Sequence, residues 1–391
     1  MTAPIVAVIG GGQLARMLTG PATELGVTLR VLVETPDAPA AGGAHQVVVG
    51  LPGDADAVAS VLDGATVVTW EHEHIPAAVF AAAAARGIPA LPSQAALAHA
   101  RDKIVMRSAM DALGLPNPEW REVDSVADVE AFLAEHGPAA ILKTAMGGYD
   151  GKGVRVIRSA AEAAEAADWI DAAAAGGPRL LIEEKVAFTR ELSAQVARTA
   201  SGDVVAYPVV ESTQRDGICA EVIAPAPGLD PLLAAAAQGL AVTIAAELDV
   251  VGMLAVELFE VGGSIVINEL AMRPHNSGHW SMDGAVTGQF EQHLRGVLGL
   301  PLGDVASTAA WTVMVNVLGG ERRELTTALA EVPDGGAKIH LYGKDVRPGR
   351  KVGHVNVSGA ELTKTLTRAR QAADIVRDGA PVAGTGPGGE A

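Results

Sequence analysis

The sequence predicts an α/β protein with a parallel N-terminal sheet, a small α/β module and a larger, mainly antiparallel α+β module. Three observations support this prediction. Short β-branched runs alternate with alanine-rich helical stretches over about the first 100 residues, which is typical of a Rossmann-like sheet. A second strand–helix pattern surrounds a glycine-rich stretch at residues 147–153. Beyond residue 190 the strand signals are separated mainly by turns, which indicates antiparallel pairing.

The chain has 391 residues, enough for about two to four modules. The predicted divisions are 1–100, 101–190, 191–300, 301–376 and 377–391. The strands that define them are expected at residues 5–9, 28–33, 67–70, around Lys143, 180–183, 204–210, 253–259, 264–268, 311–317 and 337–341, with a helix at 102–113. The fourth division is β-rich. The last is rich in glycine and proline without periodicity, and we predict that it is disordered.

The composition argues against several classes of function. The 29 basic and 46 acidic side chains give a formal net charge of −17, which disfavours broad binding to nucleic acid or anionic lipid. No segment reaches the roughly 18 apolar residues of a membrane span. The N-terminus enters a strand without a basic region, so we expect no signal peptide. Cys219 is the single cysteine, which excludes an internal disulfide and is compatible with the reducing cytoplasm.

A glycine-rich stretch follows the strand that contains Lys143. Four of the seven residues 147–153 are glycine, and backbone N–H groups without a nearby Cβ can approach an anion closely. Lys143 and Lys152 add mobile positive charge. No Gly-Lys-Ser/Thr triplet has the spacing of a P-loop. The stretch therefore predicts a phosphate-binding loop of another kind, and a plain glycine-rich hairpin is the alternative.

An acidic hairpin follows about 115 residues later. Glu257 lies on its first strand, Asn268 and Glu269 lie on its second, and Gly262-Gly263 marks the turn. A two-residue turn places Glu257 opposite Asn268, whereas a three-residue loop at 262–264 places it opposite Glu269 with both carboxylates on one face. Two carboxylates about 5 Å apart repel by roughly 3 kcal/mol at an effective dielectric near 20. A shared Mg²⁺ would remove this repulsion and explains the second pairing; a solvent-facing acidic hairpin is the alternative.

Two N-terminal motifs indicate a substrate contact. Gly10-x-Gly12-x-x-Ala15, with Glu34 after the second strand, matches the dinucleotide fingerprint. We favour a phosphate or substrate contact by Gln13 at the helix start over NAD binding or plain strand–helix packing. In Glu71-His72-Glu73-His74, the two glutamates share one face of a strand end and are interpreted as facing a substrate hydroxyl or amine. A zinc site and a solvated strand end are the alternatives.

Two further clusters lie toward the C-terminus. Residues 273–280 carry an arginine, imidazoles, an amide and a hydroxyl, which together suit a small polar substrate. Residues 344–351 gather four cations in an acidic protein, and a Pro348-Gly349 turn would bring them together. We interpret this second cluster as a monophosphate pocket, with an ordinary surface run as the alternative.

In combination, these motifs resemble the ATP-grasp superfamily and, within it, the 5-(carboxyamino)imidazole ribonucleotide synthases of purine biosynthesis. The resemblance runs from about Ile5 to Asn356. The motifs that carry it are Gly-Gly-Gln-Leu at 11–14, Thr-Trp-Glu-His-Glu-His-Ile at 69–75, the glycine-rich 147–153, Asn-Glu-Leu-Ala-Met-Arg-Pro-His-Asn-Ser-Gly-His-Trp at 268–280 and Val-Arg-Pro-Gly-Arg-Lys-Val-Gly-His at 346–354. The last two are the most specific.

The resemblance implies an ATP-grasp architecture and a role for each motif. ATP and Mg²⁺ would be the cofactors, and ATP, bicarbonate and 5-aminoimidazole ribonucleotide would give the N-carboxylated nucleotide, ADP and phosphate through carboxyphosphate. The implied ATP-binding residues are Lys103, Lys143, Gly148, Tyr149, Asp150, Gly151, Lys152, Gly153, Val154, Glu183, Glu184, Lys185, Val186, Glu191, Gln214, Asn268 and Glu269. The implied ribonucleotide-binding residues are Gln13, Leu14, Glu73, Asn276, Ser277, Lys344 and Arg350. Glu257 and Glu269 would ligate Mg²⁺, and Tyr149, Asp150, Arg273 and His275 would act in catalysis.

Some points stay open at this level. Gln214 stands where such enzymes usually carry a histidine, and glutamine cannot titrate. Either His275 or Asp150 would accept the amine proton. The resemblance also implies a homodimer. The alternatives for function are another ATP-grasp ligase (a formate-dependent glycinamide ribonucleotide transformylase or a biotin-dependent carboxylase), a non-catalytic nucleotide-sensing module, and a nicotinamide dehydrogenase.

Overall fold

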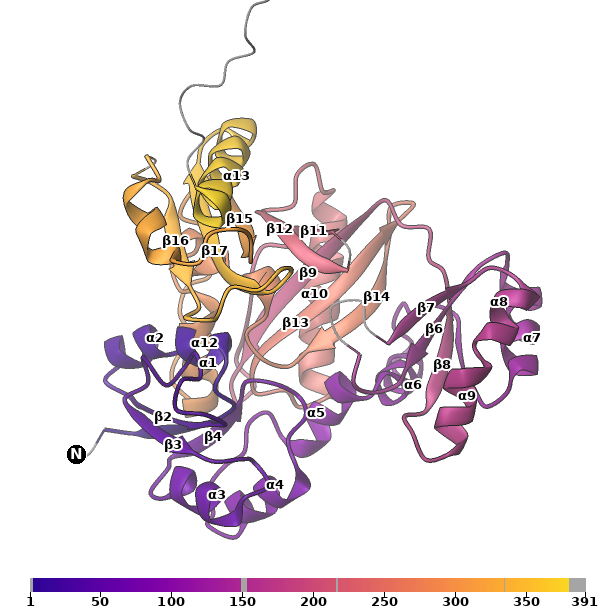
Figure 1. Cartoon of the computed structure of the whole chain (residues 1–391), viewed down its shortest axis with the longest axis horizontal. Coiled ribbons are helices and arrows are strands. Elements are labelled where there is room, and N and C mark those ends of the chain that lie inside the picture. The colour runs from indigo at the N-terminus through magenta and orange to yellow at the C-terminus, as the bar shows by residue number, and fades with distance from the viewer. Residues whose placement is uncertain (1–2, 149–152, 216, 334, 380–391) are drawn as a thin grey trace, which may run out of the picture.

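A computed structural model describes residues 3–148, 153–215, 217–333 and 335–379 of the chain. Three sheets account for its strands (Figure 1). The N-terminal sheet, the small sheet and the large sheet follow one another along the chain, as the sequence predicts. In the described ranges, no helix has both the length and the apolar character needed to cross a bilayer.

The N-terminal sheet is parallel, with the strand order β3-β2-β1-β4. Val6 to Ile9 of the central strand are completely buried because strands flank them on both sides and helices cover both faces. The three predicted strands are present, and the edge strand β3 is one that the sequence pattern does not predict. The elements are β1 (Ile5–Ile9), α1 (Gln13–Met17), α2 (Thr19–Glu24), β2 (Thr28–Val33), β3 (Gln46–Val49), α3 (Ala55–Leu62), β4 (Val67–Trp70), α4 (Ala77–Ala84) and α5 (Gln94–Arg101).

The small sheet is antiparallel, with the order β5-β8-β6-β7, and its helices pack around Phe132 and Leu142. Helix α6 (Lys103–Ala112) leads into it, and the Asp102 carboxylate caps that helix by accepting from the backbone N–H groups of Ile104 and Val105. The predicted helix at 102–113 is thereby confirmed. The other elements are β5 (Trp120–Val123), α7 (Val126–His136), β6 (Ala140–Thr144), β7 (Val154–Ile157), α8 (Ala160–Glu165), α9 (Ala167–Ala174) and β8 (Leu180–Glu184).

The large sheet is antiparallel throughout and has the order β14-β13-β9-β11-β12-β15-β17-β16, with β10 beside β9. Pairing of β12 with β15 joins strands of the predicted third and fourth divisions in one sheet. The elements are β9 (Arg190–Arg198), β10 (Val204–Ala206), β11 (Val210–Arg215), β12 (Ile218–Ala224), α10 (Pro231–Glu247), β13 (Gly252–Val261), β14 (Ser264–Ala271), η1 (Asn276–Gly278), α11 (Ser281–Gly284), α12 (Gln289–Leu298), β15 (Trp311–Leu318), η2 (Leu325–Ala330), β16 (Lys338–Leu341), β17 (Lys351–Gly359) and α13 (Leu362–Asp378).

Two predictions about the large sheet are wrong in detail. The expected strand at 204–210 is two strands, β10 and β11, with a break between them. Helix α13 was not predicted, and it includes Arg377 and Asp378, which were assigned to a disordered tail. Its buried face consists mainly of small residues such as Ala369 and Ala372. Residues 380–391 of the predicted tail lie outside the described ranges.

Candidate active site

A cavity of about 770 Å³ lies where the end of β4, helix α6, the small sheet and the hairpin β13–β14 meet. Most of the predicted site residues line it. The predicted residues that do so are Glu73, Lys103, Lys143, Gly148, Val154, Glu183, Glu184, Lys185, Val186, Glu191, Gln214, Glu257, Asn268, Glu269, Arg273, His275 and Asn276. Tyr149, Asp150, Gly151 and Lys152 lie outside the described residues. The fold thus brings together segments that are far apart in the sequence.

The acidic hairpin places Glu257 directly opposite Glu269, as predicted, but by a different route. Val261 pairs with Ser264, so the turn has two residues and the predicted three-residue loop is wrong. Gly262 and Gly263 have φ of 56° and 83°, the positive values that a tight hairpin turn of this length requires.

A β-bulge restores the predicted pairing. Leu258 pairs with Ile267 and Glu257 with Glu269, so Asn268 is an extra residue in β14. Because side chains alternate along a strand, this insertion turns Glu269 to the same face as Glu257. The sequence gives no local signal for a bulge at this position.

The electrostatics of the acid pair suit a bound cation. Burial, with the nearby Glu269 carboxylate acting in the same direction, raises the pKa of the Glu257 carboxyl to about 8. Lys103 Nζ lies 3.6 Å from Glu269 Oε1, and His275 Nε2 lies 3.8 Å from Glu257 Oε1. Two carboxylates and the Asn268 amide are oxygen ligands of the kind that Mg²⁺ prefers. The described residues hold no group of three or more His, Cys, Asp or Glu side chains placed to bind a metal ion by themselves, so waters and phosphate oxygens would complete such a site.

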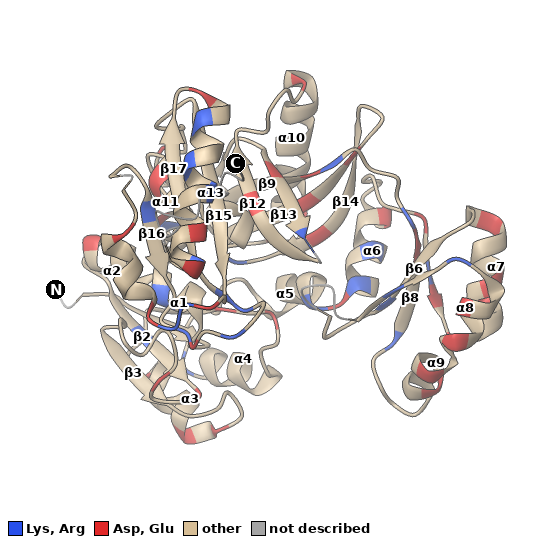
Figure 2. Ribbon diagram, turned by 45° about the horizontal axis from the view of Figure 1, so that its top comes forward, with Lys and Arg blue, Asp and Glu red and all other residues tan. Residues whose placement is uncertain are grey.

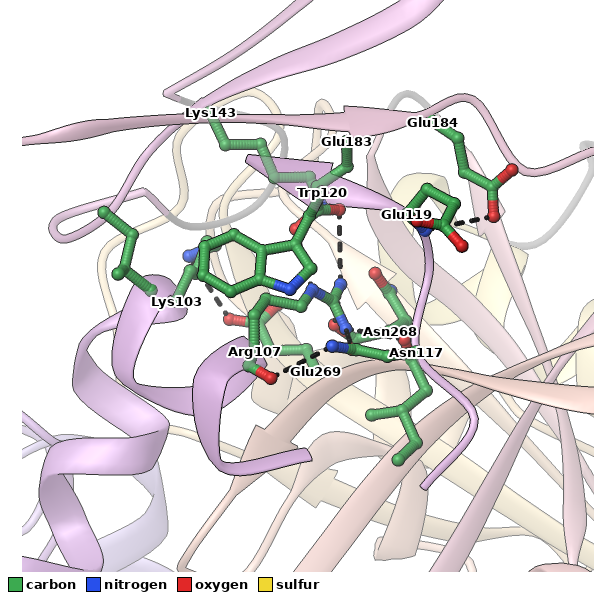
Figure 3. A network of polar contacts seen from close by, with 12 residues as sticks. Lys103, Arg107, Asn117, Glu119, Trp120, Lys143, Glu183, Glu184, Asn268 and Glu269 are labelled. Carbon is green, nitrogen blue, oxygen red and sulfur yellow. Dashed lines mark hydrogen bonds and ion pairs between the residues drawn. The ribbon is translucent and has the colours of Figure 1, made fainter. Parts of the chain in front are cut away.

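A buried ion network holds Lys143 at the other side of the cavity (Figure 3). Its Nζ lies 2.6 Å from Glu183 Oε2, and Arg107 Nε lies 2.9 Å from Glu183 Oε1. Burial alone would raise the pKa of the Glu183 carboxyl, but Lys143 and Arg107 together lower it to about 2. The Glu183 carboxylate is therefore held by these two cations at the cavity wall. Arg107 was not predicted as a site residue, because in the sequence it resembles an ordinary helical arginine.

The segment after β8 forms the far end of the cavity. Phe188 and Phe259 stack with ring centroids 4.5 Å apart, and both line the cavity although neither was predicted. Burial, opposed by a hydrogen bond from Gln214, raises the pKa of the Glu191 carboxyl to about 6. The Gln214 amide also donates to Ser212 Oγ at 3.1 Å.

The His275 loop forms the wall nearest the N-terminal sheet. Arg273 Nε lies 2.8 Å from Glu73 Oε1, which joins a predicted catalytic residue to a predicted substrate-binding residue. Burial lowers the pKa of the His275 imidazole to about 3, with the Arg273 and Lys351 charges acting in the same direction. Ser277, predicted to bind substrate, is fully buried behind the cavity wall, where its hydroxyl lies 2.8 Å from His275 Nδ1.

Buried side chains that the sequence did not reveal support this loop. Ser193 and Gln195 on β9 lie 2.8 and 2.9 Å from Ser277 Oγ. Gln289 Oε1 accepts from the His275 backbone N–H at 2.8 Å, and its Nε2 donates to the His275 carbonyl at 2.9 Å. These contacts fix the loop from behind, and they involve residues too far apart in the chain for a sequence motif to show.

The glycine loop after β1 is filled by a side chain of the protein. The Glu71 carboxylate accepts from the backbone N–H groups of Gly12 and Leu14, where a dinucleotide phosphate would sit in the fingerprint. A Cβ at Gly12 would collide with this carboxylate, which explains the glycine. The prediction that Glu71 faces a substrate is therefore wrong, and only Glu73 of that pair reaches the cavity.

The predicted monophosphate cluster is spread over more than one location. Lys344 Nζ donates to Gln13 Oε1, so the C-terminal segment contacts the N-terminal glycine loop. Arg347 is exposed and lies 3.6 Å from Asp345, whereas Lys351 lines the cavity. The Pro348-Gly349 turn is present, with Arg350 N donating to Arg347 O at 3.0 Å. The described residues that line the cavity do not include five predicted ones: Gln13, Leu14, Gly153, Lys344 and Arg350.

Comparisons with known proteins agree with this geometry. The ribonucleotide synthetase preATP-grasp domain matches residues 3–101, the ATP-grasp domain matches 108–290, and the phosphoribosylaminoimidazole carboxylase C-terminal domain matches 312–368. The N5-carboxyaminoimidazole ribonucleotide synthase of Mycobacterium bovis is 48% identical over 385 residues, which cover 96% of this chain and 89% of that protein. The chain belongs to the N5-carboxyaminoimidazole ribonucleotide synthase family.

Solved structures of family members have the same fold. The enzyme from Thermus thermophilus is 38% identical, with a TM-score of 0.85 over 96% of this chain and 99% of that chain. A structure of the Aspergillus clavatus enzyme in complex with ADP and 5-aminoimidazole ribonucleotide is 30% identical, with a TM-score of 0.86 over 96% and 99% of the two chains. The predicted family, ATP-grasp fold and ligase class are confirmed.

Proposed function

We propose that this chain uses ATP and bicarbonate to carboxylate 5-aminoimidazole ribonucleotide in purine biosynthesis. One observation carries the proposal. Two cationic side chains, Lys103 and Lys143, line the same cavity as the paired carboxylates of Glu257 and Glu269. In a chain of this family, that arrangement suits a triphosphate and its metal. Figure 2 shows basic residues on α6 and acidic residues on β13 and β14.

Lys143 and Lys103 would bind the ATP phosphates, and Glu257, Asn268 and Glu269 would hold Mg²⁺. When bound, Mg²⁺ neutralises charge that develops on the transferred phosphoryl oxygens. Lys143 is positioned for the same task because Glu183 fixes its ammonium group at the cavity wall. Bicarbonate is a poor electrophile, and its phosphorylation to carboxyphosphate would activate it. The loop around 146–154 would cover the reacting groups and exclude water.

The opposite wall would bind the ribonucleotide and bicarbonate. Arg273, His275 and Asn276 line the cavity there, with Glu73 held by Arg273. Lys344 and Arg350 would approach the monophosphate from the C-terminal segment. Lys344 donates to Gln13, and the Arg350 guanidinium donates to the Asp345 carbonyl at 3.3 Å.

The hydrogen bonds of His275 bear on the choice of proton acceptor. The Ser277 backbone N–H donates to His275 Nδ1 at 3.4 Å, which favours the neutral tautomer that carries its proton on Nε2. In that tautomer Nε2 donates a hydrogen bond to an anionic oxygen and cannot accept the amine proton. Of the two candidates, this supports Asp150 as the acceptor and His275 as a donor to the carboxylate being transferred.

The decisive variant for the metal site is Glu269→Gln. We expect it to abolish ADP release that depends on both bicarbonate and aminoimidazole ribonucleotide, because a glutamine amide lacks the negative charge with which Glu269 would hold the cation beside Glu257. The measurement is coupled ADP production, with circular dichroism to show that the fold persists. Glu247→Gln, at the exposed end of α10, is the matched control and should keep normal turnover. Near-normal turnover in Glu269→Gln would remove the metal assignment.

The same assay separates the alternative functions. A formate-dependent transformylase would release ADP with formate and glycinamide ribonucleotide instead, and a nucleotide sensor would bind ATP without releasing ADP. A cytoplasmic location and a homodimer also form part of the proposal. Light scattering after size-exclusion chromatography would measure the mass, and a mass near 39.8 kDa, that of one chain, would exclude the dimer.

A further inference from the structure

Arg107 on α6 is fully buried, and all five of its N–H groups have acceptors. Nε and Nη2 donate to the two carboxylate oxygens of Glu183 at 2.9 and 3.2 Å. Nη1 donates to Asn117 Oδ1 and to the Ile267 carbonyl, both at 2.8 Å, and Nη2 also donates to the Asn268 carbonyl at 2.9 Å. Figure 3 shows the guanidinium between the small sheet and the β13–β14 hairpin. Five donors in a fixed plane are a property of arginine that lysine cannot reproduce.

Two of these acceptors belong to the bulge that pairs the acidic residues. Strand β14 is at the edge of the large sheet, so its outward carbonyls have no neighbouring strand. The carbonyls of Ile267 and Asn268 instead accept from Arg107, while the Ile267 N–H donates to the Pro116 carbonyl at 2.9 Å. The bulge is thus held from outside the hairpin, at the residue whose insertion turns Glu269 toward Glu257.

The remaining bonds of Arg107 reach the phosphate-binding lysine. The Glu183 carboxylate is shared by Arg107 and Lys143, so one negative charge lies between two positive charges. A net positive charge is left for a phosphate at Lys143. Without the Arg107 guanidinium, the whole negative charge of Glu183 would neutralise the positive charge of Lys143. Arg107 therefore acts on both halves of the cavity, by charge on one side and by geometry on the other.

We propose that Arg107 is a positioning residue for phosphoryl transfer, which fixes the metal-binding carboxylates relative to Lys143 across the junction of the two sheets. Arg107 is not one of the described residues that line the cavity, so it acts through Glu183 and the β14 backbone. This role rests on the function proposed above. It extends the machinery of the site to a buried residue that contacts neither nucleotide nor metal.

The test is Arg107→Lys, which keeps the charge and removes the planar fork. We expect kcat to fall by roughly tenfold or more, and the Mg²⁺ concentration for half-maximal rate to rise by about fivefold, while the KM for the ribonucleotide stays within about twofold. Calorimetry measures the binding of ADP in the absence of turnover. The Kd of ADP measured with Mg²⁺ should rise by about fivefold, and the Kd measured without Mg²⁺ should change by less than about twofold.

The matched control is Arg370→Lys. Arg370 also makes a two-pronged pair, donating to Glu221 at 2.7 and 3.0 Å, but it lies on α13 away from the cavity. This variant should leave kcat and both Kd values unchanged. A folded Arg107→Lys with the Mg²⁺ dependence of the wild type would overturn the proposal. If that variant does not fold, Asn117→Ala decides: it removes one acceptor of Nη1, and it should weaken Mg²⁺-dependent ADP binding about twofold. No change in a folded Asn117→Ala would then overturn the proposal.

The two proposals fail in different ways. Normal turnover in Glu269→Gln would remove the metal site and, with it, the role of Arg107. An inactive Glu269→Gln together with an unaffected Arg107→Lys would leave the proposed function in place and remove only the positioning role.

Discussion

The carboxylates in the cavity differ in how strongly neighbouring cations stabilise their ionised form. Glu183 stays ionised because Lys143 and Arg107 outweigh the effect of burial, and its pKa falls to about 2. Glu191 has no cation of comparable effect, so burial raises its pKa to about 6. The first carboxylate suits a permanent ion network. The second changes its protonation state in a range that enzyme assays reach.

Glu191 leads to a prediction about pH. If its carboxylate accepts hydrogen bonds from the ATP ribose, protonation removes an acceptor, so the KM for ATP should rise as the pH falls through about 6. A charge-assisted hydrogen bond contributes about 1.5–3 kcal/mol, so the rise should be on the order of tenfold. The measurement is the KM for ATP between pH 8 and 5.5. Glu191→Gln cannot titrate and should lose this dependence; if it keeps the same pH profile, another group is responsible.

The residues that sequence reasoning recovered are those within motifs. Lys143, Glu257, Glu269 and His275 belong to stretches whose composition is unusual for a strand or a loop, and the structure places all four at the cavity. Arg107 has no such context. Its importance comes from acceptors up to 161 positions away, which no local pattern contains.

At the scale of elements, the turn and the bulge of the β13–β14 hairpin have different effects on which residues pair. The two glycines have positive φ, so the turn depends on them, but the bulge at Asn268 determines which residues face each other. The sequence predicted the strands and the final pairing. It did not predict the bulge, because the acceptors and donors that hold it lie on α6 and the segment after it.

This difference can be tested with Gly263→Ala. Alanine at φ 83° is strained, so we expect the free energy of unfolding to fall by about 1–2 kcal/mol. The kcat should stay within about twofold, because the bulge and not the turn sets Glu257 opposite Glu269. Gly239→Ala is the control: Gly239 is exposed inside helix α10, and the same change there should stabilise the protein by about 0.5–1 kcal/mol. Thermal unfolding and steady-state kinetics measure both. A folded but inactive Gly263→Ala would show that the turn sets the register.

At the scale of the whole molecule, the N-terminal module contacts the segment that follows β16. Lys344, just after β16, donates to Gln13 at the start of α1, and both were predicted to bind the ribonucleotide. Helix α1 and the segment after β16 are therefore in contact through these two side chains. A monophosphate at this junction would bind to groups from two segments that lie 331 positions apart in the chain.

Lys344→Ala tests that junction. We expect the KM for the ribonucleotide to rise by roughly tenfold or more, since an ammonium–phosphate contact contributes about 1.5–3 kcal/mol, with little change in kcat. Lys338→Ala, at an exposed position on β16, is the matched control and should leave both constants unchanged. Initial rates at varied ribonucleotide and saturating ATP give the values. A rise in the KM for ATP alone would mean that the phosphate pocket lies elsewhere.

The sequence by itself determined the class of the fold, the order of its three sheets and the family. Those properties depend on local periodicity and on motifs, which are written in contiguous residues. The tertiary structure alone decided that a bulge aligns the acidic pair, that Glu71 fills the glycine loop, and that Arg107 links the two sides of the cavity. Each of these depends on a hydrogen bond between distant segments, and such a bond exists only after the chain has folded.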